Sequence, residues 1–144
     1  MAVRDEDQPL LDLLGEVRLG ALVTLKRSGR PQLSTVNHLW DPAAGELRVS
    51  VTQDRAKTRN LLRDPRASYY VSRPDGSAYA VAEGTVVLTE PAADAHDDTV
   101  AAMVAHYRAV AGEHPDWDEF RAAMVSERRL LLRLPVSHVY GWAG

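Results

Sequence analysis

The chain has 144 residues, a mass of 15.9 kDa and a formal net charge of −3. This length predicts one domain, residues 1–144, which is large enough to bury a sizeable core. Hydrophobic residues make up 45% and charged residues 26% of the chain, which excludes a disordered or fibrous protein. No run approaches eighteen apolar residues, so we expect no membrane span, and the opening MAVRDEDQP has no apolar signal core. We therefore expect a cytoplasmic protein.

Cysteine is absent, which excludes disulfides, thiolate metal sites, iron–sulfur clusters and cysteine nucleophiles. The acidic net charge gives no overall signature of nucleic-acid binding. Of the 17 cationic residues only Lys26 and Lys57 are lysines. This preference for arginine, together with heavy alanine usage, hints at a GC-rich bacterial genome.

The first half of the chain is typical of a helix followed by a β-meander. Apolar residues recur at helical spacing within 9–18, and residues 20–36 form a strand, a turn at Ser28-Gly29 and a second strand. A further turn at 41–45 leads to a third strand over 46–51. Residues 53–65 predict a short helix, with Asp54 as its N-cap and Asp64-Pro65 at its end.

The second half predicts more strands and two longer helices. Residues 66–73 are strand-like, Asp75-Gly76 is a hairpin signal, and 77–90 is a long strand in which Gly84 marks a bulge or bend. Helices are expected over 94–112 and 117–128, and a single strand over 130–142 closes the chain. The sum is six or seven strands and four helices. Because the connections between the early strands are too short for parallel crossovers, we expect a small antiparallel β-barrel with helices packed outside.

The most informative segment is a run of cations on the predicted short helix. It places five of them within twelve residues: Arg55, Lys57, Arg59, Arg63 and Arg66. A cation in the first helical turn opposes the helix dipole at a cost of about 0.3–1 kcal/mol. The pattern makes sense if a phosphate binds there, held by free backbone N–H groups and by Arg55 and Lys57. Ser50 and Thr52 precede the helix and could add hydroxyl donors, and Asn60 lies within reach.

Two other readings of this segment stay open. The cations could simply form a solvated helix face, or they could bind nucleic acid. The second reading is the weakest, because no RNP, KH or helix-turn-helix signal accompanies them.

Other chemistries find little support. The five histidines show no zinc-type spacing, so we expect no metal. Ser34 lacks the G-x-S-x-G context of a serine hydrolase, and glycine-rich phosphate loops are absent. Along the last strand, period-two alternation places four residues on one face: Val136, His138, Tyr140 and Trp142. They could be core or dimer packing, or an aromatic wall against a planar ligand, and Tyr79 and Glu83 are equally ambiguous.

The segment RAKTRNLLRDPRAS, preceded by GRPQLSTV and followed by YAVAEGTV and PVSHVYG, resembles the pyridoxamine 5'-phosphate oxidase-like split-barrel flavoproteins. Within these it is similar to the actinobacterial class B oxidoreductases that use the deazaflavin coenzyme F-420. The similarity runs in order over about residues 10–141. It implies a mainly β, six-stranded antiparallel split barrel with flanking helices, and a homodimer with two cofactor sites at the subunit interface.

The resemblance also implies roles for individual residues. Arg55 and Lys57 would hold the cofactor phosphate, assisted by Ser50 and the Ala56 N–H, while Val51 lines the same pocket and Asn60 supports the helix end. The ring would lie along Gln32, Leu33 and Ser34, which offer backbone groups to its polar edge. Three residues would approach from the other subunit: Tyr79, His138 and Tyr140.

The chain departs from the founding oxidase, because it lacks a C-terminal R-x-R-x-E-type signature and ends soon after the last strand. FMN ends at its phosphate, whereas the deazaflavin continues into an oligoglutamate tail that needs further cations. Arg59, Arg63 and Arg66 could supply them if they face one groove, and Arg55, Arg59 and Arg63 lie four residues apart on one helical stripe. This favours coenzyme F-420 over FMN.

The resulting hypothesis is a reductase that transfers a hydride from the reduced deazaflavin to a small conjugated substrate, with a proton from solvent, His138 or Tyr140. No catalytic residue and no particular substrate is indicated. The alternatives are an FMN-dependent oxidoreductase, a non-catalytic flavin-, deazaflavin- or haem-binding protein, and a structural dimer that binds no small molecule. No nucleic acid or membrane is expected as a partner.

Overall fold

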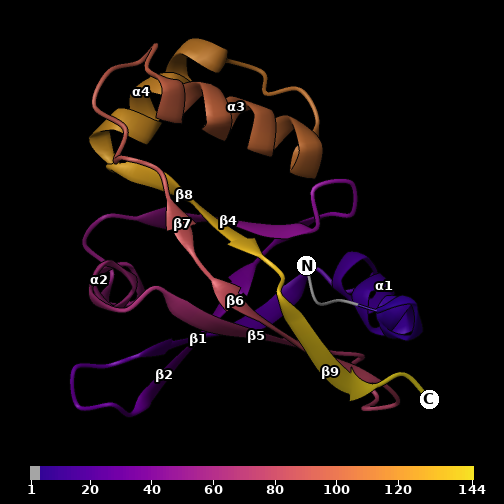
Figure 1. Ribbon diagram of the computed structural model, residues 1–144. Helices are drawn as coiled ribbons and strands as arrows, with labels where there is room; N and C mark the ends of the chain where they lie inside the picture. The colour runs from indigo at the N-terminus through magenta and orange to yellow at the C-terminus, as the bar shows by residue number, and fades with distance from the viewer. Residues whose placement is uncertain (1–3) are drawn as a thin grey trace.

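The computed structural model describes residues 4–144, which form two antiparallel sheets around a shared core (Figure 1). The larger sheet has the order β2-β1-β5-β6-β9 and the smaller one the order β3-β4-β8-β7. The strands of the larger sheet are β1 (Leu19–Leu25), β2 (Pro31–Asn37), β5 (Arg66–Ser72), β6 (Tyr79–Thr85) and β9 (His138–Trp142). Those of the smaller sheet are β3 (Leu39–Asp41), β4 (Glu46–Thr52), β7 (Val87–Leu88) and β8 (Arg129–Pro135).

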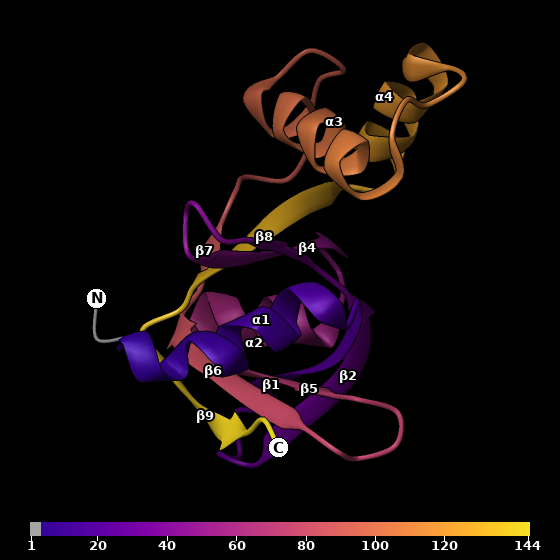
Figure 2. The ribbon, with the colours of Figure 1, turned by 90° about the vertical axis from the view of Figure 1, so that its right-hand side faces the viewer.

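Four α-helices and a short 3-10 helix surround the sheets. They are η1 (Asp5–Asp7), α1 (Gln8–Glu16), α2 (Ala56–Arg63), α3 (Asp98–Ala111) and α4 (Trp117–Ser126). Figure 1 shows α1 and α2 at opposite ends of the barrel, between the two sheets. Figure 2 shows α3 and α4 stacked on the outer side of the smaller sheet. None of the helices between residues 4 and 144 is long and apolar enough to cross a membrane.

The chain passes from one sheet to the other four times, once through α2 between β4 and β5 and three times at short corners, which makes the two sheets one barrel. His38 lies between β2 and β3, Val86 between β6 and β7, and residues 136–137 between β8 and β9. At the second corner, a Cβ on Gly84 would lie 2.2 Å from the carbonyl oxygen of Pro135. Only glycine allows β6 to pass β8 this closely, two residues before the chain changes sheets at Val86.

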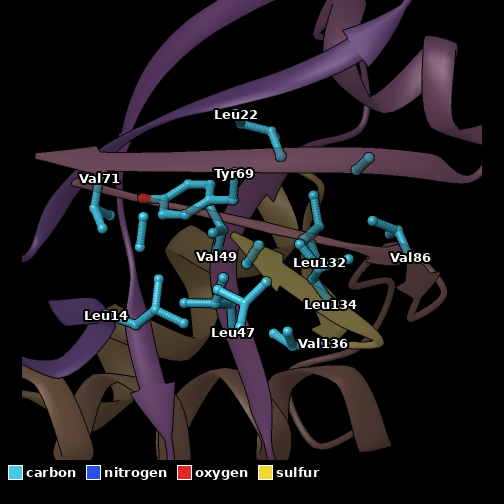
Figure 3. Close-up of a cluster of buried hydrophobic side chains, with 14 of the residues drawn as sticks. Leu14, Leu22, Leu47, Val49, Tyr69, Val71, Val86, Leu132, Leu134 and Val136 are labelled. Carbon is cyan, nitrogen blue, oxygen red and sulfur yellow. The ribbon is translucent and has the colours of Figure 1, made fainter. Parts of the chain in front are cut away.

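The barrel core is filled from both sheets and from α1 (Figure 3). Leu47, Leu132 and Leu134 of the smaller sheet face Leu22 of the larger one, and each is 1% exposed. Tyr69 is fully buried among them, and its ring occupies the space that a side chain at position 20 would need: a Cβ on Gly20 would lie 2.5 Å from it. The core therefore depends on glycine at that position.

A second, smaller core lies between α3, α4 and β8. As the helical spacing predicts, Val100, Met103 and Val104 of α3 are buried, and so are Phe120 and Met124 of α4. Both helices begin at an aspartate whose side chain accepts a backbone N–H: Asp97 from Val100 at 2.8 Å and Asp116 from Glu119 at 3.1 Å. Tyr107 packs at the edge of this core, whereas Val110 is 37% exposed.

Three details of the fold differ from the sequence predictions. Residues 4–144 form nine strands instead of six or seven, because the runs 77–90 and 130–142 are each divided where the chain changes sheets and because β3 was not predicted. The division also breaks the predicted alternation: Val136 is 1% exposed in the core, while His138, Tyr140 and Trp142 face outward. Asp54 is not the N-cap of α2. Arg55 occupies that position, and no side chain caps the helix.

Candidate functional site

The N-terminus of α2 has no side-chain cap and is the candidate anion site. Arg55 is the N-cap in extended conformation, and Ala56 and Lys57 are the first two helical residues. The backbone N–H groups of a first turn have no partner within their own helix. Since no side chain caps α2, these donors and the positive end of the helix dipole are available to a ligand.

Three cations gather around this helix end. Burial lowers the pKa of Lys57, and the charges of Arg55 and Arg129 lower it further. Among residues 4–144, neither Arg55 nor Lys57 forms an ion pair, and only Glu127 offsets Arg129, at 3.1 Å from its Nε. An anion would relieve this mutual repulsion, so the position favours a multiply charged group such as a phosphate.

Arg129 is the member of the cluster that the sequence analysis missed. It lies on β8 opposite Thr52 of β4, and its Nη1 donates to Ser50 Oγ at 3.3 Å. Arg129 is 79 positions beyond Ser50 in the sequence, and only the β4–β8 register brings it to this end of the cation run. No local sequence signal reports such a pairing.

Ser50 and Val51 point in opposite directions, as neighbours on a strand must. Ser50 faces α3 and α4 and lines a hollow below them. Val51 is 2% exposed in the barrel core. Any contact of Val51 with a ligand at this site would therefore come from its backbone.

Asn60 fastens α2 to the larger sheet. Its Nδ2 donates to Gln32 Oε1 at 2.8 Å and to Thr24 Oγ1 at 3.1 Å, and its Oδ1 accepts from Arg63 Nη2 at 3.1 Å. Asn60 is only 7% exposed, so these bonds are shielded from water. The Gln32 side chain thus holds the helix. The predicted contacts of Gln32, Leu33 and Ser34 with a ligand would therefore be made by their backbone groups on β2. As an edge strand of its sheet, β2 has backbone groups free to do so.

The arginines expected to form one groove for an acidic tail do not do so. Arg63 turns back to the barrel and donates to the Leu25 carbonyl oxygen at 2.9 Å. Arg66 pairs with Asp64 at 2.8 Å, and this bond lowers the pKa of Asp64 to about 2. Arg59 alone of the three has no ion pair or side-chain hydrogen bond within residues 4–144 and is exposed. Of the helical stripe formed by Arg55, Arg59 and Arg63, Arg63 therefore has a closer partner, and Arg66 lies outside the helix at the start of β5.

The remaining candidates lie on the outer face of the larger sheet. The strand registers place Leu33, Val23, Ser68, Glu83 and His138 in one row across all five strands. Leu33 and His138 are at opposite edges, roughly 19 Å apart at about 4.8 Å per strand. They cannot both touch one ring within a single chain.

Aromatic side chains gather at the β9 edge of this face. The rings of Tyr70 and Tyr79 are 6.0 Å apart, as are those of His138 and Tyr140, and Trp142 pairs with Tyr79 across the strands. Between the two edges is a hollow of about 410 Å³ that includes Val23, Ser68 and Glu83. The structure thus divides the predicted residues into a cationic group at α2 and an aromatic group on the far edge of the larger sheet.

No three histidine, aspartate or glutamate side chains in the described part of the chain gather closely enough to hold a metal ion.

A barrel of two antiparallel sheets, in which the chain passes repeatedly from one sheet to the other, defines the split-barrel class of proteins. The family model described as pyridoxamine 5'-phosphate oxidase matches residues 7–143. The chain therefore belongs to the pyridoxamine 5'-phosphate oxidase family.

Solved structures with this fold have differing functions. An F420 reductase shares 22% identity over 90% of this chain and 94% of its own, with a TM-score of 0.67. A heme binding protein from Mycobacterium smegmatis shares 23% identity, covering all of this chain and 56% of its own, with a TM-score of 0.71. The heme storage protein HutZ from Vibrio cholerae shares 16% identity over 97% and 94%, with a TM-score of 0.64. At these identities the likeness is one of fold.

Proposed function

We propose that the protein is an oxidoreductase that binds a flavin-type cofactor by its phosphate and transfers a hydride between it and a small conjugated organic substrate. The observation that carries this proposal is the uncapped first turn of α2, where Arg55 and Lys57 have no ion-pair partner within residues 4–144. The donor set fits a phosphate dianion: two cationic side chains, backbone N–H groups and the Ser50 hydroxyl, which Arg129 already orients.

The protein's part in the reaction is to bind and orient. When bound, the cofactor would supply the hydride chemistry. Arg55 and Lys57 would fix its phosphate, and the rigid attachment of α2 through Asn60 would set where the attached ring falls along β2. His138 Nε2 or Nδ1 and the Tyr140 hydroxyl, both on the exposed face of β9, are available to deliver a proton, as is solvent.

The deazaflavin coenzyme F-420 is our preferred cofactor, and FMN is the alternative. The F420 reductase among the structures of similar fold supports this choice. In this chain, Arg59 is one turn beyond Arg55 on α2, exposed and without an ion pair in the described residues, so it is placed to meet a carboxylate beyond the phosphate. Because Arg63 and Arg66 have other partners, the tail contact that we propose involves Arg55 and Arg59 only.

We further propose that the active form is a homodimer built on the outer face of the larger sheet. Leu33, Tyr70, Tyr140 and Trp142 are 42–62% exposed there, an unusual apolar surface for a monomer. A second copy would bring its His138, Tyr79 and Tyr140 toward the β2 edge of the first. Within one chain this is not possible, because these three residues lie near the β9 edge of the sheet and β2 is the opposite edge.

Haem binding without turnover is a second candidate. His138 is exposed on β9 beside Tyr140, within an aromatic surface, and an imidazole there could bind iron axially. The heme binding and heme storage proteins of similar fold support considering it.

A titration of the purified protein with coenzyme F-420, FMN and haemin in parallel tests these proposals, followed by the fluorescence of Trp40, Trp117 and Trp142 and by absorbance. Binding of F-420 that is at least tenfold tighter than that of FMN supports the deazaflavin reductase, and tighter FMN binding moves the protein to the FMN oxidoreductases. A Soret band at unit stoichiometry, abolished by His138→Ala, supports haem binding. Failure of both flavins to bind overturns the oxidoreductase proposal.

A further inference from the structure

The second core, between the helical pair α3–α4 and the smaller sheet, is incompletely filled. Two hollows of about 250 Å³ and 180 Å³ lie there, and His106 of α3 lines both. Figure 2 shows this helical pair on the side of the molecule away from the larger sheet. The hollows are therefore separate from the face proposed for the dimer and for the cofactor ring, although the larger one shares Ser50 and Arg129 with the proposed phosphate site.

The larger hollow has apolar walls. Met103 and Tyr107 of α3 and Phe120 and Met124 of α4 form most of them. The rings of Tyr107 and Phe120 meet at 61° with their centroids 5.1 Å apart. At about 30 Å³ per water molecule, the hollow has the volume of about eight waters, enough for one or two fused rings. Methionine sulfur and aromatic edges both favour contact with another aromatic ring.

His106 supplies an unmet hydrogen-bonding group. Its Nδ1 is buried and has no partner among the described residues. Burial lowers the pKa of His106, and the nearby Arg48 charge lowers it further, so the ring is neutral at physiological pH. A buried ring nitrogen without a partner is costly. A rotation of the ring that opens Nδ1 to the hollow would let a hydroxyl group satisfy it in either tautomer, because a hydroxyl both donates and accepts.

The rim of the larger hollow carries one arginine and one glutamate, and two more cations lie close to that arginine. Arg129 and Glu127 lie on it, next to Ser50. Arg129 Nε donates to Glu127 Oε1, and Arg129 Nη1 donates to Ser50 Oγ. The Nη2 of Arg129 has no protein partner in residues 4–144. Arg55 and Lys57 add to the field around Arg129. One carboxylate among three cations leaves the rim attractive to an anion.

From this arrangement we infer that the hollow between α3, α4 and the smaller sheet binds a small planar aromatic carboxylate, of one or two rings, that carries a hydroxyl group. The carboxylate pairs with Arg129, the rings lie among Met103, Phe120 and Met124, and the hydroxyl reaches His106. An oligoglutamate chain does not suit this site, because its many carboxylates would lie against apolar walls. The site does not depend on the proposed flavin binding and is tested without any cofactor.

Calorimetric titration of the full-length, cofactor-free protein with 6-hydroxy-2-naphthoate tests the inference. Ala111→Trp places an indole on the rim from an exposed helical position, and Ala101→Trp, on the same helix but outside the hollow, is its matched control. We expect saturable binding that Ala111→Trp weakens at least tenfold and that Ala101→Trp leaves within twofold. Arg129→Gln should weaken it by about tenfold or more, and Arg128→Gln, which lies outside the hollow, should not.

The probe itself can be varied to assign each contact. The methyl ester of the probe lacks the negative charge. It should bind the wild type as weakly as the acid binds the Arg129→Gln variant. Removing the hydroxyl, in 2-naphthoate, should weaken binding about fivefold and abolish the probe-induced shift of the His106 ring resonances. Absence of binding at millimolar concentration overturns the inference. So does binding that is lost in the double variant Arg55→Ala/Lys57→Ala but unchanged in Ala111→Trp, since the probe would then be held at α2.

Discussion

The Nδ1 atom of His38 and the phenolic oxygen of Tyr69 are 2.6 Å apart inside the barrel, where the two residues are 5% and 0% exposed. His38 Nε2 lies 2.7 Å from the Leu14 carbonyl oxygen, which can only accept, so Nε2 carries the ring proton and Nδ1 accepts from Tyr69. One imidazole thereby joins the end of α1, the corner between β2 and β3, and the middle of β5. The barrel is closed at this point by a polar contact within an apolar core.

Replacing Tyr69 with Phe should lower the free energy of unfolding by about 1–3 kcal/mol, because it leaves a buried His38 nitrogen without a partner. Burial raises the pKa of Tyr69 far above its usual value, so the hydroxyl is a donor throughout the working pH range. Urea denaturation followed by circular dichroism measures the loss. Tyr70→Phe is the control, since Tyr70 is on the same strand but 42% exposed, and an equal midpoint for the two variants would contradict this account.

Stability should fall as the pH drops below about 6.5. Burial lowers the pKa of His38 and of His106 in the folded protein. At pH values between these lowered pKa values and about 6.5, the unfolded chain therefore binds more protons than the folded protein does. The free energy of unfolding should be flat above about pH 7.5 and decrease from about pH 6.5 to pH 5. Carboxylates such as Asp64, whose pKa is about 2, affect stability only at lower pH.

Urea midpoints between pH 8 and pH 5 test this dependence. The double variant His38→Gln/His106→Gln should lose most of the slope. His96→Gln, on the surface before α3, should keep it. A slope that survives in the double variant would place the responsible protons elsewhere.

Much of the fold could be predicted from local patterns. The turn at Ser28-Gly29 and the buried face of α3 each depend on residues close in sequence, and the structure confirms them. The split of residues 130–142 into two strands was missed, because alternation of apolar residues continues through Pro135. The change of sheet there depends on long-range bonds, such as the one from Val136 N to the Gly45 carbonyl oxygen at 3.0 Å.

In the candidate site too, the features set by neighbouring residues could be predicted from the sequence, whereas those set by long-range contacts could not. Arg55, Ala56 and Lys57 are consecutive, so their place at a helix N-terminus could be read from the sequence. The contribution of Arg129 depends on strand pairing and could not. The partner of Arg63 could not be predicted either, because a helical stripe shows which residues share a face but not which neighbours they contact.

The double variant Arg55→Ala/Lys57→Ala should weaken binding of coenzyme F-420 or FMN by a hundredfold or more. Each charge-assisted hydrogen bond to a phosphate contributes roughly 1.5–3 kcal/mol, and about 1.4 kcal/mol corresponds to tenfold. The thermal midpoint of the cofactor-free protein should stay level or rise, since two repelling cations are removed. Lys26→Ala/Arg27→Ala, in the exposed turn between β1 and β2, is the matched control. Unchanged cofactor affinity in the first variant would exclude the α2 site.

Salt should distinguish tail recognition from phosphate recognition. Arg59 is exposed, so its attraction to a tail carboxylate is screened at high ionic strength. We expect Arg59→Gln to weaken F-420 binding several-fold at about 20 mM salt and hardly at all at about 500 mM, where the Debye length falls to only a few ångströms. FMN, which has no tail, should bind the variant as it binds the wild type. An equal loss for both cofactors would show that Arg59 acts on the phosphate instead.

Introducing a charge at the β9 edge should dissociate the proposed dimer into monomers. Trp142 is 58% exposed beside Tyr79, and Trp142→Glu would bury a carboxylate in any interface that covers this surface. Leu62→Glu, at a position 70% exposed on α2, introduces the same charge away from it. Sedimentation velocity should show a dimer for the wild type and for Leu62→Glu, and a monomer for Trp142→Glu. Because His138 is proposed to reach the cofactor of the other subunit, the monomer should also lose cofactor affinity while its circular dichroism is unchanged. A monomeric variant with full affinity would mean that one chain forms the whole site.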